Sequence, residues 1–263
     1  MVSFLQDQSV CLSGMLLVGL TTGLAMLAPI LVRRYVTLDR LIANNEVAGF
    51  KFAVVGVLYA VLLAFAIIVV WEKFTDADNI VAREAGAATN VYRLSYGMAE
   101  APATSLRARL SAYLAATVSD DWPAMQHANE SSSARRALDA VYGSALVSLS
   151  AQSHSALVAE VLHQLDEITQ ARRARIVAAD GTVPGVIWPV LFGGAAITVG
   201  FTFFFGTQNL PAQSLMTGLL SVMIFSGLFI VVVIDRPFSG AVTVKPDALA
   251  KVLAEFGTTP ATQ

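Results

Sequence analysis

The fold is decided by VPGVIWPVLFGGAAITVGFTFFF at residues 183–205 and AQSLMTGLLSVMIFSGLFIVVVI at residues 212–234, two apolar runs without a charge. Each run is long enough to cross a hydrocarbon core, which takes about 20 apolar residues of helix. The join between them, GTQNLP at residues 206–211, is rich in turn-forming residues. The polar sequence DRPFSG at residues 235–240 ends the second run. The stretch therefore predicts a membrane hairpin.

Two further apolar runs precede this hairpin, at residues 11–32 and 50–71. No Lys or Arg precedes the first run, so we interpret it as a retained span and not as a secretory signal. We expect an all-α polytopic membrane protein with four transmembrane helices. We expect a first helix pair at residues 1–72, a helical extramembrane domain at 73–182, a second helix pair at 183–234, and an interfacial turn with a tail at 235–263.

The composition supports the membrane class. Hydrophobic residues make up 56% of the 263 and charged residues only 14%, whereas a soluble domain has about 25% charged residues. A net charge of −2 argues against nucleic acid as the main partner. The single cysteine, Cys11, cannot form an intrachain disulfide, and no ligand spacing indicates a metal or another cofactor.

The region between the second and third spans carries most of the charge and has apolar residues at helical spacing. We expect helices at residues 75–98, at 103–118, from about Ala134, and at 153–178. The sequence DWP at residues 121–123, preceded by Asp120, is expected to break the second of these helices.

The orientation in the membrane is expected from the cations that flank the first span. Arg33 and Arg34 follow that span and no cation precedes it, which places the amino terminus outside. The helical domain follows two crossings later and is then also extracytoplasmic. We expect the membrane to be an inner or plasma membrane. Arg172, Arg173 and Arg236 flank the third and fourth spans on the side of the membrane that would then be external, and their charges favour the opposite orientation.

A set of short motifs resembles one known family. The motifs are NEVAG at 45–49, Tyr59 and Phe65 in a span closed by Trp71, REA at 83–85, Tyr92 with Arg93, WPAM at 122–125, Pro184 with Trp188, and DRPFSG at 235–240. The chain resembles the bestrophin-like domain family of bacterial and plant membrane proteins over nearly its whole length. The resemblance implies similarity to bestrophins, which are pentameric anion channels with four membrane helices per subunit and a cytosolic helical region. The sequence lacks the cluster of acidic residues that binds calcium in animal bestrophins, so calcium regulation is not implied.

Three phenylalanines are candidates for a pore constriction. Phe201, Phe204 and Phe205 are three and four residues apart, which places them on one face if the third span stays helical. Such rings from several subunits would form a hydrophobic gate that closes by dewetting. The alternative is contact with lipid or with a neighbouring helix.

Charged and polar residues near the ends of the spans are candidates for an ion entrance. They are Asn44, Asn45, Glu46, Lys51, Arg83, Glu84, Asp235 and Arg236. Each has a structural alternative: helix capping for the asparagines, a solvated helix face for Arg83 and Glu84, and interfacial anchoring for Asp235 and Arg236.

Two functions remain open from the sequence. The first is a homo-oligomeric membrane protein that conducts small ions, most simply anions, along a path between subunits. The second is a non-conducting scaffold or signalling protein whose helical domain binds a partner. We find no nucleophile with a base, no paired intramembrane carboxylates and no phosphate loop, so we do not expect an enzyme.

Overall fold

The computed structural model describes residues 10–151, 156–240 and 242–258. Within these residues the regular secondary structure is entirely helical. The chain divides into two compact units. The membrane unit comprises Met1–Glu72, Thr182–Asp235 and Gly240–Val242, and the helical unit comprises Lys73–Gly181, Arg236–Ser239 and Thr243–Gln263.

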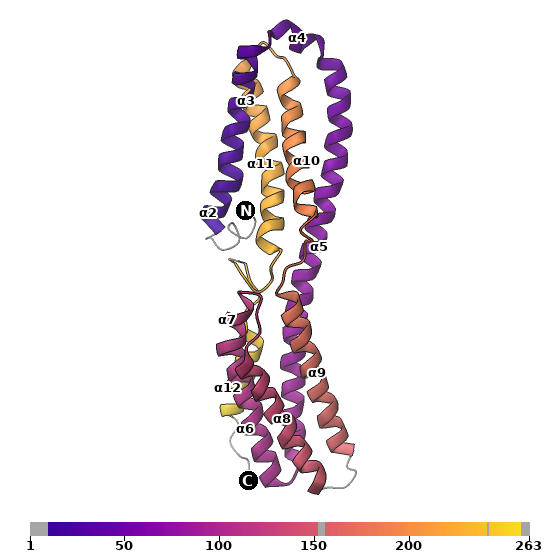
Figure 1. Cartoon of the computed structure of the whole chain (residues 1–263), viewed down its shortest axis with the longest axis vertical. Helices are drawn as coiled ribbons and strands as arrows, with labels where there is room; N and C mark the ends of the chain where they lie inside the picture. The colour runs from indigo at the N-terminus through magenta and orange to yellow at the C-terminus, as the bar shows by residue number, and fades with distance from the viewer. Residues whose placement is uncertain (1–9, 152–155, 241, 259–263) are drawn as a thin grey trace. The chain divides into compact units, whose positions relative to one another are not determined.

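Among the residues that the structure describes, four helices are long and apolar enough to cross a bilayer, and their apolar parts lie in the membrane unit, which confirms the predicted fold class (Figure 1). Its elements are α2 (Val10–Gly14), the π-helical turn η1 (Met15–Leu20), α3 (Thr21–Tyr35), α4 (Leu38–Ala43), residues 45–72 of α5 (Asn45–Leu94), α10 (Ile187–Phe201), the 3₁₀ turn η4 (Thr202–Phe204) and α11 (Leu210–Ile234). The third span is shorter than expected, because α10 begins only at Ile187 and its last turn is η4.

The α11 helix forms the centre of the membrane unit. In its most apolar window 56% of the residues are buried, against 11% for α5. It packs along α3, where Gly218 lies against Met26. On α5, the ring of Tyr59 covers Gly194 of α10, and its hydroxyl donates a hydrogen bond of 3.1 Å to the Leu191 carbonyl. A Cβ atom at position 194 would collide with this ring, so the contact requires glycine.

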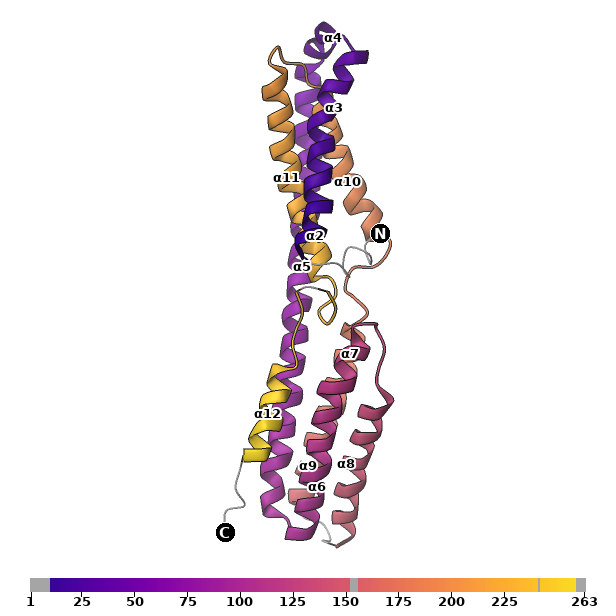
Figure 2. The ribbon, with the colours of Figure 1, turned by 90° about the vertical axis from the view of Figure 1, so that its left-hand side faces the viewer.

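The helical unit is a bundle with one apolar core (Figure 2). It contains residues 73–94 of α5, the turn η2 (Ser95–Gly97), α6 (Glu100–Ala116), the π-helical turn η3 (Thr117–Asp121), α7 (Trp122–Met125), α8 (Ser132–Ala151), α9 (Ala156–Ala178) and α12 (Asp247–Thr258). Buried residues recur every three or four positions, as in Leu106, Leu110 and Leu114 of α6 and Val161, Leu165 and Ile168 of α9. This spacing puts them on one face of each helix, where they pack into the core.

Two expectations about this unit are wrong. Asp120 and Pro123 do not break the helix that contains α6, because η3 carries the chain into α7, which holds Pro123 near its start. The region 235–263 was expected to hold an interfacial turn and a tail, yet it contains α12, which packs on α6 and whose residues Leu249 and Val252 belong to the core of the unit. The expected start of the last long helix at Ser153 lies outside the described residues.

Candidate functional site

One candidate site is the junction between the start of α5 and the loop that joins η4 to α11 in the membrane unit. The side-chain amide of Asn45 donates to the Gly206 carbonyl, and its oxygen accepts from the Gly206 N–H, each at 2.8 Å. Gly206 itself has no room for a side chain, since a Cβ atom would lie 2.7 Å from the backbone nitrogen of Ile42. Asn45 therefore fastens the loop to α5 and is not free to contact an ion.

The same loop is held from its other side by Arg33 and Gln213. The Arg33 guanidinium donates to the Thr207 carbonyl and, at 2.8 Å, to the side-chain oxygen of Gln213. The Gln213 amide in turn donates to the Phe205 carbonyl at 2.5 Å. Both contacts come from the Nη2 atom of Arg33, so this side chain helps to position the loop.

The three candidate phenylalanines do not share one helical face. Phe201 ends α10, and its ring lies 6.3 Å from that of Phe204. Phe205 follows the last turn with an extended backbone, and its ring packs edge-on against Phe52 of α5 at 5.7 Å. Phe204 is 61% exposed and is therefore the candidate whose ring is available outside the protomer.

The entrance candidates near the start of α5 are mostly at the surface. Asn44, Glu46 and Lys51 are exposed, and the Asn44 amide donates to the Arg40 carbonyl at 3.0 Å. At the end of α11, Asp235 is buried and one of its carboxylate oxygens accepts from the N–H groups of Thr182 and Val183 at 3.1 and 2.7 Å. Arg236 is partly buried.

The helical unit holds a second candidate, a buried network of four charged side chains. The Glu84 carboxylate accepts from the Nε and Nη2 atoms of Arg175 at 2.8 and 3.2 Å. Asp121 accepts from Arg175 at 3.2 Å and, with both oxygens, from Arg172 at 2.9 and 3.0 Å. Glu84, Asp121 and Arg175 are completely buried and Arg172 is 5% exposed, so two carboxylates and two guanidinium groups balance one another inside the unit.

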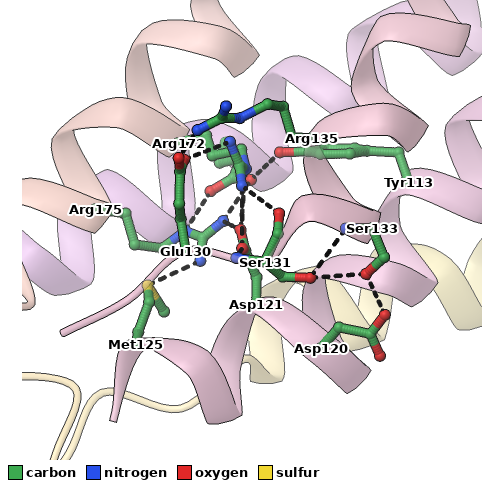
Figure 3. Close-up of polar contacts among 11 residues, drawn as sticks. Tyr113, Asp120, Asp121, Met125, Glu130, Ser131, Ser133, Arg135, Arg172 and Arg175 are labelled. Carbon is green, nitrogen blue, oxygen red and sulfur yellow. Dashed lines mark hydrogen bonds and ion pairs between the residues drawn. The ribbon is translucent and has the colours of Figure 1, made fainter. Parts of the chain in front are cut away.

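Neutral groups complete the network (Figure 3). The Tyr113 hydroxyl donates to Glu84 at 2.5 Å, and the backbone N–H of Ser131 donates to Asp121 at 2.9 Å. The remaining face of the Arg175 guanidinium lies 4.8 Å from the Trp122 ring, and its Nη1 atom is 3.1 Å from the Met125 sulfur. Each buried charge thus has an oppositely charged partner and further hydrogen bonds, which burial of a charge requires.

Burial and the neighbouring charges shift the pKa values of Tyr113 and Arg175. Burial raises the pKa of Tyr113 well above its ordinary value, and the Glu84 charge raises it further. For Arg175, burial opposes the charged form, but attraction to Glu84, the hydrogen bonds to Glu84 and attraction to Asp121 outweigh it, and the pKa rises. Both shifts keep Tyr113 neutral and Arg175 charged at physiological pH. The network therefore joins α5, α6 and α9 as a fixed structural element.

The placement of Glu84 corrects a sequence expectation. Glu84 was expected on a solvated helix face beside Arg83, but it is completely buried and pairs with Arg175, whereas Arg83 is exposed. Sequence reasoning also missed Tyr113, Asp121 and Arg172 as members of one network. A signal was present: Arg172 and Arg175 extend the apolar stripe of Val161, Leu165 and Ile168 at the same three- and four-residue spacing. Charges at core positions of a helix indicate burial with a partner.

No metal site accompanies these groups in the part of the chain that the structure describes, since no three His, Cys, Asp or Glu side chains lie together in a suitable arrangement.

Comparison with known proteins finds a family model that matches this chain and solved structures that share its fold. A family model described as "Bestrophin-like domain" matches residues 19–249. A crystal structure of a bacterial Bestrophin homolog from Klebsiella pneumoniae superposes with a TM-score of 0.72 at 16% identity, covering 92% of this chain and 99% of that chain. A variant of that homolog gives a TM-score of 0.73 at 14% identity, covering 93% and 98% of the two chains. No curated protein sequence matches the chain.

Proposed function

This chain belongs to the Bestrophin-like family, and on that basis we propose that it is a homo-oligomeric channel that conducts small anions across an inner or plasma membrane. The family match over residues 19–249 is the observation that carries the proposal. The central parts of the four spans contain no Asp, Glu, His, Lys or Arg, so a single protomer offers no charged relay through the bilayer. We therefore place the ion path between copies of the chain.

The exposed side of α5 is suited to contact between copies. Ala53, Gly56, Ala60 and Ala64 follow one another at three- and four-residue spacing and line an apolar groove of about 500 Å³. Small side chains let helices approach closely in membranes. A Cβ atom at Gly56 would meet no atom within 4 Å in the protomer, so this glycine is not needed for folding of the isolated subunit. We assign the groove to a helix of a second copy.

Phe204 is the proposed constriction, supported by Phe201 beside it. Its exposed ring belongs to an uncharged turn at the end of the third span. Several such rings facing a common axis would exclude water when they approach and admit ions when they part. Phe205 has an internal packing partner, Phe52, and belongs to the support of this turn.

Lys51 is the proposed entrance residue, since it is exposed near the start of α5, where the helix dipole also favours anions. Exposed Asn44 and Glu46 flank the same end. Arg83 and Arg236 remain candidates for positively charged residues that line the ion path. Glu84 and Asp235 are engaged by internal hydrogen bonds, so we give them structural roles.

We further propose that the helical unit is cytoplasmic, as the cytosolic helical region of bestrophins implies. The Arg33 and Arg34 pair predicts the opposite side, but Arg33 is bonded to Thr207 and Gln213, which gives it a structural reason to be present. Lys73, Arg173 and Arg236 also favour a cytoplasmic helical unit.

The test is chloride flux from liposomes that contain purified protein of known oligomeric state. We expect flux above that of protein-free vesicles, and we expect Phe204→Ala to increase it because the constriction widens. Leu219→Ala is the matched control, since Leu219 is also an exposed apolar residue of the membrane unit. Gly56→Leu should fill the groove on α5, shift the protein from oligomer to monomer and abolish flux.

Absence of flux from a stable wild-type oligomer would refute the channel and favour a scaffold whose helical unit binds a partner. Equal effects of Phe204→Ala and Leu219→Ala would remove Phe204 from the ion path.

A further inference from the structure

A groove of about 590 Å³ lies between α8 and α9 in the helical unit. Three arginines line it: Arg135 from α8, and Arg172 and Arg173 from α9. Beside them, Leu138 and Ile176 contribute an apolar wall. Such a combination of several guanidinium groups with an apolar surface suits an organic anion.

Arg172 connects this groove to the buried network. Its Nε and Nη2 atoms are committed to Asp121, and Nη2 also donates to the Ser131 carbonyl at 3.3 Å. Its Nη1 atom has only a longer ion-pair contact, 3.7 Å from the Glu130 carboxylate. Because Arg172 is buried and held by Asp121, its Nη1 atom faces the Glu130 carboxylate in the lining of the groove from a fixed position.

Glu130 places a carboxylate between two of the arginines. One of its oxygens pairs with Arg135, and the other faces Arg172 (Figure 3). Its side chain is 36% exposed and belongs to the loop ahead of α8, so it can move aside without disturbing the core. Arg173 is exposed at the rim, and no ion pair joins it to any residue that the structure describes.

We propose that the groove binds a small organic phosphate and that the Glu130 carboxylate occupies the phosphate position when the ligand is absent. A phosphate has three oxygens for charge-assisted hydrogen bonds, one for each of Arg135, Arg172 and Arg173. Its apolar portion contacts Leu138 and Ile176. Asp139, the second acid in the groove, opposes the ligand and limits its affinity.

The test uses phenyl phosphate and inorganic phosphate as probes, titrated by calorimetry into the full-length protein in detergent. We expect one saturable site per chain, with phenyl phosphate tighter because its ring covers the apolar wall. Glu130→Gln and Asp139→Asn should each tighten binding several-fold by removing a competing charge. Arg173→Gln should weaken it about tenfold, the loss expected for one charge-assisted hydrogen bond.

Arg136→Gln is the matched control, because Arg136 is an exposed arginine of α8 that does not line the groove. All variants change surface side chains, and retained elution volume and helical circular dichroism verify their folding. Absence of saturable binding by both wild type and Glu130→Gln would overturn the proposal. So would equal weakening by Arg136→Gln and Arg173→Gln, which would indicate non-specific attraction. The assay involves no ion flux, so its result is independent of the channel proposal.

Discussion

The Glu84 carboxylate is stable inside the helical unit because three hydrogen bonds reach it, two from Arg175 and one from Tyr113. A buried ion pair contributes little net stability, since desolvation offsets attraction, but removing one partner costs about 3–5 kcal/mol. The network therefore acts mainly by making other arrangements of these helices unfavourable. An alternative packing that separated Arg175 from Glu84 and Asp121 would bury unpaired charges.

Tyr113 gives this network a measurable pH dependence. An unfolded tyrosine loses its proton near pH 10, whereas the folded pKa is raised, so the unfolded chain releases its proton first as the pH rises. The stabilisation is fully present below about pH 10 and is lost between that pH and the folded pKa. We expect Tyr113→Phe to lower the free energy of unfolding by about 1–3 kcal/mol at pH 8, because Glu84 loses a donor. We also expect a shallower decline above pH 10 than in the wild type.

The measurement is unfolding of the full chain in detergent, followed by circular dichroism at pH 8 and pH 10.5. Tyr96→Phe is the control, since the Tyr96 side chain is exposed and its hydroxyl donates to that of Tyr92 at 3.4 Å. Identical pH slopes for wild type and Tyr113→Phe would contradict the assignment.

At the scale of elements, the sequence predicted the helices that depend on a local pattern of apolar residues. The four spans follow from uncharged runs, and the positions of α6, α8 and α9 follow from apolar residues at helical spacing. The π-helical turn η3 was missed because Asp120 and Pro123 are usual helix breakers, while tertiary contacts of Asp121 hold the helical path. The pairing of Glu84 with Arg175 spans 91 residues, and no local pattern identifies such a partner.

The loop between η4 and α11 offers a test at this scale. Asn45→Ala removes both hydrogen bonds to Gly206 and leaves its partly buried backbone groups without these partners, so we expect a loss of about 1–3 kcal/mol in stability. Asn45→Asp keeps the acceptor for the Gly206 N–H and should lose less. The readout is the temperature at which the detergent-purified oligomer loses its elution peak.

Asn44→Ala is the control for this loop, because the Asn44 side chain is exposed and donates to the Arg40 carbonyl one turn earlier. A loss equal to that of Asn45→Ala would show that the loop is not held by Asn45.

For the whole molecule, the decisive prediction concerns the side of the membrane. Cys11 is the only cysteine, so Cys11→Ser provides a background for single-cysteine labelling. We expect a membrane-impermeant maleimide to label Glu46→Cys in intact cells and to label Ala108→Cys only after the cells are opened. Both positions are exposed, Glu46 between the first two spans and Ala108 on α6 of the helical unit. The reverse pattern would place the helical unit outside, as Arg33 and Arg34 alone predict.

The distance in sequence between Glu84 and Arg175 also has a consequence for synthesis of the protein. At about 5–20 residues per second, a ribosome needs roughly 5–18 s to proceed from one to the other. During that interval α5 exists, but the cation that neutralises Glu84 does not, so this face of the helix cannot be buried without an uncompensated charge. The nascent helical unit must therefore remain open until α9 has left the ribosome, and chains truncated before Arg172 should be substrates for proteolysis.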